Sequence, residues 1–149
     1  MTHELPVSIQ ERDAAERFAG AGGDEILVRL GTGGSDPVTV VEGVSEDREW
    51  APQHSHPWDE LTYVLEGTIE FRVGDLRSSG GPGALVSLPR GVPHTLRVPE
   101  GEARYLMITL GAPSLGFLRD VGQVYADGPT LERLLDVAAK HGVKPALEE

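Results

Sequence analysis

The sequence predicts an all-β domain, an antiparallel barrel or sandwich followed by short helices. Three observations lead to this fold class: many short strand candidates, glycine- and proline-rich turns between them, and a helical period near the C-terminus. With 149 residues the chain fits a single domain, and such a domain buries about 68–70% of its unfolded surface. The 19 glycines and 11 prolines are spread along the chain, which suits turns rather than a disordered tract.

The elements follow in a simple order. Residues 1–24 are polar and glycine-rich, so we expect a loosely held N-terminal arm before a barrel core at about 25–111. Strand candidates lie at 25–31, 38–44, 84–88, 94–98 and 103–110, with a hairpin at 60–75 that turns at Glu66 and Gly67. In the C-terminal segment, 112–149, we expect one helix at 114–121, capped by Ser114 and ended by Gly122, and another at 130–141.

Composition excludes several classes of protein. The net charge of −11 argues against nucleic acid, because binding there requires clustered lysine and arginine. The chain has no cysteine, which rules out disulfides and thiolate ligands and is compatible with the cytoplasm, where we expect the protein. The first 18 residues do not read as a signal peptide, and no apolar run reaches the roughly 18 residues of a membrane span.

The expected hairpin has two different faces. Pairing across its turn places Glu60 on an apolar face, whose other members are Thr62, Val64, Ile69, Phe71 and Val73. The opposite face carries Leu61, Tyr63 and Leu65, which need cover from another element or a second subunit. We therefore expect a homodimer.

The stretch HSHPWDE, residues 54–60, contains three side chains that can bind a metal. His54, His56 and Glu60 share the parity of a strand, so an extended segment directs all three inward. A carboxylate on an apolar wall costs free energy unless it is paired, and a divalent cation removes that cost. Neutral imidazole and carboxylate suit Fe, Ni, Mn, Co, Cu or Zn. His94 follows a turn fixed by Pro89, Gly91 and Pro93 and is a candidate fourth ligand.

Two motifs resemble a known superfamily. HSHPWDELTYVLEG resembles the first cupin signature, which it matches at His54, His56, Glu60 and Gly67. GALVSLPRGVPH resembles the second, which it matches at Gly83, Pro89, Gly91 and His94. The sequence departs from the family at Arg48, where a glycine is usual, and at Val98, where an asparagine is usual; neither position supplies a ligand.

The resemblance implies a small jelly-roll barrel, also called a double-stranded β-helix. It implies one divalent transition metal per chain, bound by His54, His56, Glu60 and His94. The flanks look like those of quercetin-dioxygenase-like cupins, which often end in a helix. The superfamily includes dioxygenases, isomerases, decarboxylases and binding proteins, so the motifs predict the fold and the metal more closely than the reaction.

Three functions remain open at this stage. The first is a metal-dependent dioxygenase-like oxidoreductase acting on a small aromatic or enolic compound, with Glu60 as the base. The second is a metal-dependent isomerase or lyase, and the third is a protein that binds a small ligand without turnover. The expected substrate pocket is lined by Trp58, Thr62, Val64, Ile69, Phe71 and Leu96, although packing alone also explains these residues. We expect no catalytic role for His3 or His141.

Overall fold

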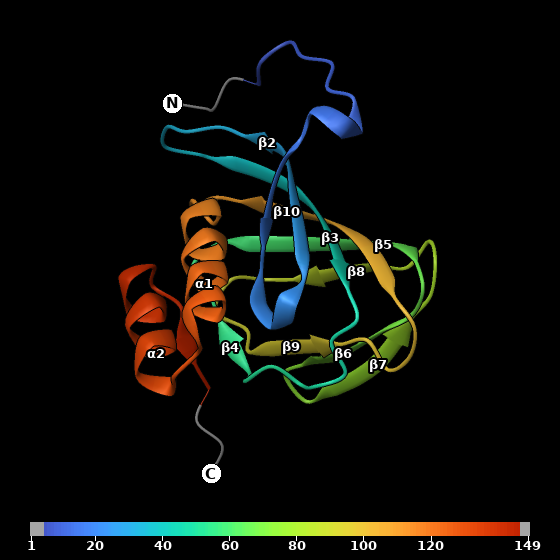
Figure 1. The fold of residues 1–149 in the computed structure, drawn as a ribbon, viewed down its shortest axis with the longest axis vertical. Helices are drawn as coiled ribbons and strands as arrows, with labels where there is room; N and C mark the ends of the chain where they lie inside the picture. The colour runs from blue at the N-terminus through green and yellow to red at the C-terminus, as the bar shows by residue number, and fades with distance from the viewer. Residues whose placement is uncertain (1–4, 147–149) are drawn as a thin grey trace.

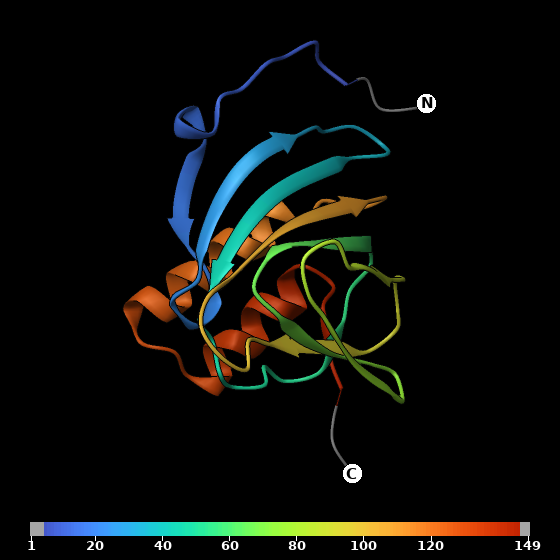
Figure 2. The ribbon, with the colours of Figure 1, turned by 90° about the vertical axis from the view of Figure 1, so that its right-hand side faces the viewer.

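A computed structural model describes residues 5–146, which form two facing antiparallel sheets and two helices (Figures 1 and 2). The first sheet has the strand order β1-β2-β3-β10-β5-β8, with bounds Glu16–Ala19, Glu25–Gly31, Val38–Ser45, Ala103–Leu110, Asp59–Glu66 and Leu85–Leu88. The second has the order β11-β4-β9-β6-β7, with bounds Lys144–Pro145, His54–Ser55, His94–Arg97, Ile69–Val73 and Leu76–Gly80. The predicted all-β fold of antiparallel strands followed by short helices is confirmed.

The expected hairpin at 60–75 is wrong in its pairing. β5 pairs with β10 and β8, whereas β6 pairs with β9 and β7, so the turn at Gly67 carries the chain from one sheet to the other. Gly67 has a φ of 76°, and a Cβ atom there would lie 2.3 Å from the carbonyl oxygen of Glu102. The true hairpin joins β6 and β7, with Val73 opposite Leu76 at its turn.

The inward faces of the two sheets nevertheless carry the residues expected there. The main core cluster consists of Val64, Ile69, Phe71, Val98, Ala103 and Tyr105. Strand alternation determines which face a side chain occupies, whichever strand lies beside it. The predicted faces therefore survive although the predicted partner strand does not.

The first C-terminal helix differs from its expected bounds. α1 spans Leu115–Asp127, so Gly122 lies inside the helix instead of ending it. Gly122 fits because α1 packs closely on the segment before β2: a Cβ atom there would lie 2.0 Å from the carbonyl oxygen of Ala19. Ser114 precedes the helix but does not cap it with its side chain, because its hydroxyl pairs with that of Thr109 at 2.6 Å.

The second helix, α2, spans Leu131–Lys140 and is capped by Thr130, whose hydroxyl accepts from the backbone N–H of Arg133. Figure 1 shows both helices on one side of the barrel, next to β4. There Ala138 and Val143 pack with Trp58 and Phe117 in a second, smaller core cluster. The C-terminal segment therefore closes the barrel beside the histidine-rich stretch.

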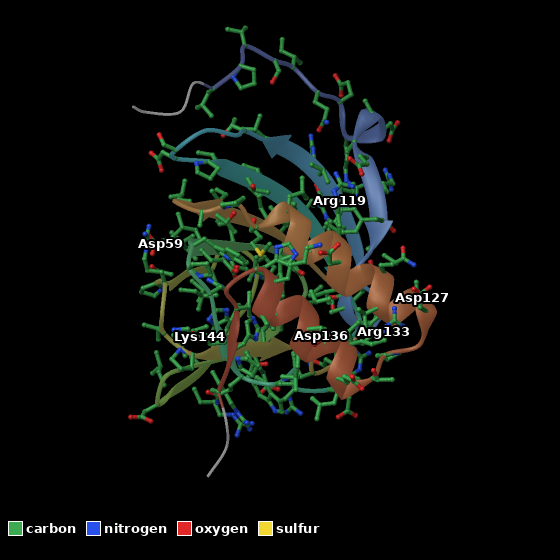
Figure 3. All side chains as sticks on the ribbon, turned by 90° about the vertical axis from the view of Figure 1, so that its left-hand side faces the viewer. Asp59, Arg119, Asp127, Arg133, Asp136 and Lys144 are labelled. Atoms are coloured by element: carbon green, nitrogen blue, oxygen red, sulfur yellow. The ribbon has the colours of Figure 1, made fainter. Side chains whose placement is uncertain are left out.

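The predicted arm contains more structure than expected. Residues Arg12–Ala14 and Ala21–Gly23 form short 3-10 turns, η1 and η2, and β1 between them pairs with β2. Arg119 of α1, labelled in Figure 3, forms an ion pair with Glu16 of β1. Within the predicted arm, residues 5–11 belong to no helix or strand, and His3 lies outside the described residues. Among residues 5–146, no helix is long and apolar enough to cross a membrane.

Candidate metal centre

Three strands and one connection bring the predicted ligands together. His54 in β4 lies directly opposite His94 at the start of β9. Glu60 lies in β5, where Thr109 of β10 is its neighbour across the sheet. His56 lies in the short connection between β4 and β5. The two sheets therefore each contribute ligands, and the candidate site lies between them.

Three of the four residues form a compact group. His56, Glu60 and His94 are buried, and one potential ligand atom from each lies within 4.8 Å of the others. His54 is half-buried beside them, with its ring centroid 4.8 Å from that of His94 and 6.0 Å from that of His56. The structure thus places His54 at the edge of the group, where its role as a fourth ligand stays a prediction.

The backbone determines the tautomer of each histidine. The Nδ1 atoms of His54, His56 and His94 lie 3.0, 2.8 and 3.1 Å from the carbonyl oxygens of Pro52, Trp58 and Val92. A carbonyl oxygen can only accept, so each Nδ1 donates and carries the hydrogen. In a neutral imidazole this leaves the lone pair on Nε2, which is the arrangement that orients histidine ligands in metal sites.

The contact between His56 and Glu60 tests whether a cation fits. Nε2 of His56 lies 3.3 Å from Oε1 of Glu60, is buried, and has no hydrogen-bond partner among the described residues. With its hydrogen on Nδ1, the imidazole presents a lone pair toward a carboxylate oxygen. Two acceptors that face each other in a buried place are costly, and a divalent cation between them satisfies both. The residues present therefore fit a metal ion.

The titration of the buried groups agrees with that fit. Burial lowers the pKa of His94 to about 4, although the Glu60 carboxylate opposes the shift. Burial also lowers the pKa of His54. For Glu60 burial acts in the opposite sense, but the contact with His56 and the charge interactions with the three imidazoles outweigh it, so its pKa is lowered. At neutral pH, His54 and His94 are accordingly neutral and Glu60 is ionised, as metal binding requires.

Two neighbours support the ligands. The hydroxyl of Thr62 donates to Oε2 of Glu60 at 3.2 Å. The indole of Trp58 stacks on the imidazole of His56, with ring centroids 4.6 Å apart and an interplanar angle of 13°. Thr62 and Trp58 therefore hold ligands in place, a role that the sequence did not suggest for either of them.

A cavity of about 320 Å³ opens between the edge strands of the two sheets. It is lined by Phe71, Val73, Leu76, Ser78, Ser79, Gly80, Ala84, Leu85, Val86 and Ser87. Val73 is the cross-strand neighbour of His94, and Val86 is the cross-strand neighbour of Thr62. The inner wall of the cavity is therefore next to the candidate metal site.

The expected substrate contacts are distributed differently. Phe71 lines the cavity, whereas Val64 and Ile69 are fully buried in the core and Leu96 packs against it. Trp58 is buried behind His56, against the helices. The sequence predicted no role for the three cavity serines, Ser78, Ser79 and Ser87. Alternation in β7 and β8 was the available signal, but it is weak in such short strands.

Comparison with known proteins agrees with this architecture. Residues 40–109 match the family model described as a cupin domain. KdgF from a Halomonas species superposes with a TM-score of 0.64 at 15% identity, over 72% of this chain and 96% of that one. The polyketide cyclase RemF from Streptomyces resistomycificus gives 0.60 at 22% identity, over 87% and 99%. An RmlC-like cupin from Shewanella frigidimarina gives 0.61 at 18% identity, over 75% and 96%.

The fold and the candidate site together define a small double-stranded β-barrel with a histidine–carboxylate centre between its sheets. Residues 40–109 match the cupin-domain model, and the chain shares its fold with solved cupins. No curated protein matches it significantly in sequence. The likeness to the quercetin-dioxygenase-like group stays a prediction.

Proposed function

We propose that the chain is a metal-dependent dioxygenase-like oxidoreductase that acts on a small aromatic or enolic compound. The main support is the position of Glu60, a buried and ionised carboxylate between two imidazoles, close to a largely apolar cavity. A transition metal held by His54, His56, Glu60 and His94 supplies Lewis acidity and, when redox-active, activation of dioxygen. The size of the cavity, about 320 Å³, suits a small molecule.

The chain's own residues have distinct tasks in this proposal. The Glu60 carboxylate takes the proton from the acidic hydroxyl or carbon of the compound, while the hydroxyl of Thr62 donates a hydrogen bond to Oε2. Val73 and Val86 present apolar surface on the cavity side, which keeps water away from the reacting atoms. Trp58 fixes the plane of His56 from behind.

A second candidate is a metal-dependent isomerase or lyase, including ring closure of the kind that the name of RemF describes. It is supported by the hydroxyls of Ser78, Ser79 and Ser87 around an otherwise apolar cavity, which suit a compound that carries several oxygen atoms. This chemistry uses the same base, Glu60, and requires no dioxygen.

Metal analysis and oxygen-uptake measurements distinguish these candidate functions. Protein purified without a histidine tag is analysed for bound metal, loaded with iron, nickel, manganese or cobalt, and offered a panel of phenols, flavonoids and diketones. We expect oxygen consumption with at least one redox-active metal and one compound. Turnover without oxygen consumption would favour the isomerase or lyase, and ligand binding without any turnover would favour a binding protein.

A further inference from the structure

Three arginines gather around one indole on the outer face of the second sheet. The guanidinium carbon atoms of Arg72, Arg97 and Arg77 lie 4.2, 4.9 and 5.5 Å from the centre of the Trp50 ring. Arg72 and Arg77 are directly opposed on β6 and β7, and Arg97 extends from β9 on the other side of β6 (Figure 1). We call these three arginines the arginine cluster. Like charges on opposed positions of a sheet cost free energy unless negative charge compensates them.

One carboxylate is paired with the arginine cluster among the described residues. Glu70 of β6 accepts from Arg97 through Oε1 at 3.1 Å and lies 3.6 Å from Arg77 through Oε2. Arg72 is half-buried and forms no hydrogen bond or ion pair with any residue in the described part of the chain. Every other arginine within residues 5–146 pairs with a carboxylate or a carbonyl oxygen. The donors of Arg72 are therefore available for a partner from outside the chain.

The neighbouring backbone holds the indole beside Arg72. Thr95 lies opposite Arg72 on β9, is buried, and donates through its hydroxyl to the carbonyl oxygen of Ala51 at 2.6 Å. Trp50 precedes Ala51, so this hydrogen bond fixes the segment that carries the indole over the sheet. Cation–π attraction holds a guanidinium over a ring and leaves its N–H groups able to donate elsewhere. The arrangement thus orders the cations before any ligand arrives.

The charge of the cluster indicates the chemistry of its ligand. Three guanidinium groups and the Glu70 carboxylate leave a net charge of +2, in a chain whose net charge is −11. Neither Asp75, in the turn after β6, nor Glu49, next to Trp50, forms an ion pair with these arginines among the described residues. A phosphate dianion supplies two negative charges, and its oxygens match the planar fork of a guanidinium.

We propose that the arginine cluster binds a phosphate dianion, either free phosphate or the phosphate group of a small molecule. Arg72 donates from the centre with its unpaired N–H groups, and Arg77 and Arg97 donate with those that Glu70 does not use. Phe71 and Val73, the neighbours of Arg72 along β6, line the cavity on the inner side of the sheet. The phosphate site is therefore separate from the candidate metal centre, and the proposal is independent of the reaction there.

Calorimetric titration with sodium phosphate at pH 8, compared with sodium chloride at equal ionic strength, tests the site. We expect saturable binding of one phosphate per chain. Arg72→Ala should weaken this binding about 10-fold or more, since it removes charge-assisted hydrogen bonds, and Arg72→Lys should restore part of the affinity. Arg119→Ala is the matched control and should bind phosphate like wild type. Arg119 also lies over an aromatic ring, 5.2 Å from the centre of Phe18, but on α1.

Glu70→Gln should change the affinity in the opposite direction. It removes the carboxylate that competes for Arg77 and Arg97, so phosphate should bind about 10-fold more tightly. Protein treated with a chelator and then desalted should bind phosphate unchanged, because no metal ligand takes part. Titration with phenyl phosphate distinguishes the sources: equal affinity favours free phosphate, and tighter binding of the ester favours a phosphorylated small molecule.

Three results would overturn the phosphate site. The first is phosphate binding no stronger than that of chloride in wild type. The second is equal phosphate affinity in wild type, Arg72→Ala and Glu70→Gln, which would show that the arginine cluster only packs against Trp50. The third is loss of phosphate binding after treatment with the chelator, which would place the anion at the metal centre.

Discussion

Nε2 of His56 lies 3.3 Å from Oε1 of Glu60, with both side chains buried between the two sheets. The Nδ1 hydrogen of His56 is committed to the carbonyl of Trp58, so these two atoms face each other as acceptors. A cation that both atoms bind relieves this repulsion. A bound ion would therefore connect the strand that carries Glu60 with the loop that carries His56.

Substitution of single histidines should show, through the change in metal affinity, which of them are ligands. His94→Ala deletes one member of the compact group, and we expect metal affinity to fall at least about 100-fold, more than the loss of an orienting partner costs. His54→Ala should weaken binding less, because His54 lies at the edge of the group. Calorimetric titration with zinc or cobalt measures both effects. His141→Ala is the control, since its ring pairs with Asp120 on α1; equal metal content in wild type and His94→Ala would remove His94 from the site.

Glu60→Gln should separate metal binding from proton transfer. The amide keeps an oxygen that can coordinate weakly, but it cannot accept a proton as the carboxylate does. We expect activity to fall by about 100-fold or more after correction for metal content. Turnover as fast as that of wild type, per bound metal, would show that Glu60 is only a ligand.

The protein without metal should lose stability as the pH falls from about 6.5 toward 4. His94 has a folded-state pKa of about 4, below its ordinary value of 6.5, because burial disfavours the charged ring. Between these two pH values His94 is protonated in the unfolded chain but neutral in the folded chain, so a lower pH favours unfolding. Urea denaturation of chelator-treated protein at a series of pH values measures this slope. His94→Gln should flatten it, and an unchanged slope would contradict the assignment.

Asp24 should show the opposite dependence on pH. Burial raises its pKa to about 6, against a hydrogen bond with Ser45, and nearby Asp47 adds to the rise. Stability from this group is present below its unfolded pKa of 3.8 and is lost as the pH rises through 6. We expect Asp24→Asn to stabilise the protein at pH 8 by about 1 kcal/mol, after allowance for solvent screening of a partly exposed group. Equal free energies of unfolding at pH 8 would contradict this.

Gly122→Ala should destabilise the protein, although alanine is normally better than glycine inside a helix by about 1 kcal/mol. The added Cβ atom would lie 2.0 Å from the carbonyl oxygen of Ala19, so α1 must move away from the chain that leads into β2. We expect a loss of about 1–3 kcal/mol in the free energy of unfolding. Gln123→Ala, on the exposed side of α1, is the control, and a gain in stability for Gly122→Ala would show that the contact is not tight.

The sequence predicted the candidate site better than the strand pairing. The spacing of His54, His56, Glu60 and His94 was informative because each of these positions lies in a short segment with a fixed direction. Alternation along β5 and β6 correctly assigned their inward-facing side chains. It carried no information about which strands are neighbours, because side chains alternate in the same way whether two strands pair in one sheet or lie in two facing sheets. The role of Gly122 depends on a contact with Ala19, about a hundred residues earlier in the chain, which no local pattern contains.

The three imidazoles are oriented by main-chain oxygens that lie two residues away along the chain. A side-chain partner can be lost by substitution, but a carbonyl is present whichever amino acid stands at position 52, 58 or 92. The orientation of the three imidazole rings therefore depends on the path of the backbone and not on the side chains around it. Substitutions in the wall of the cavity can therefore change the compound that enters while the three histidine rings keep their orientation.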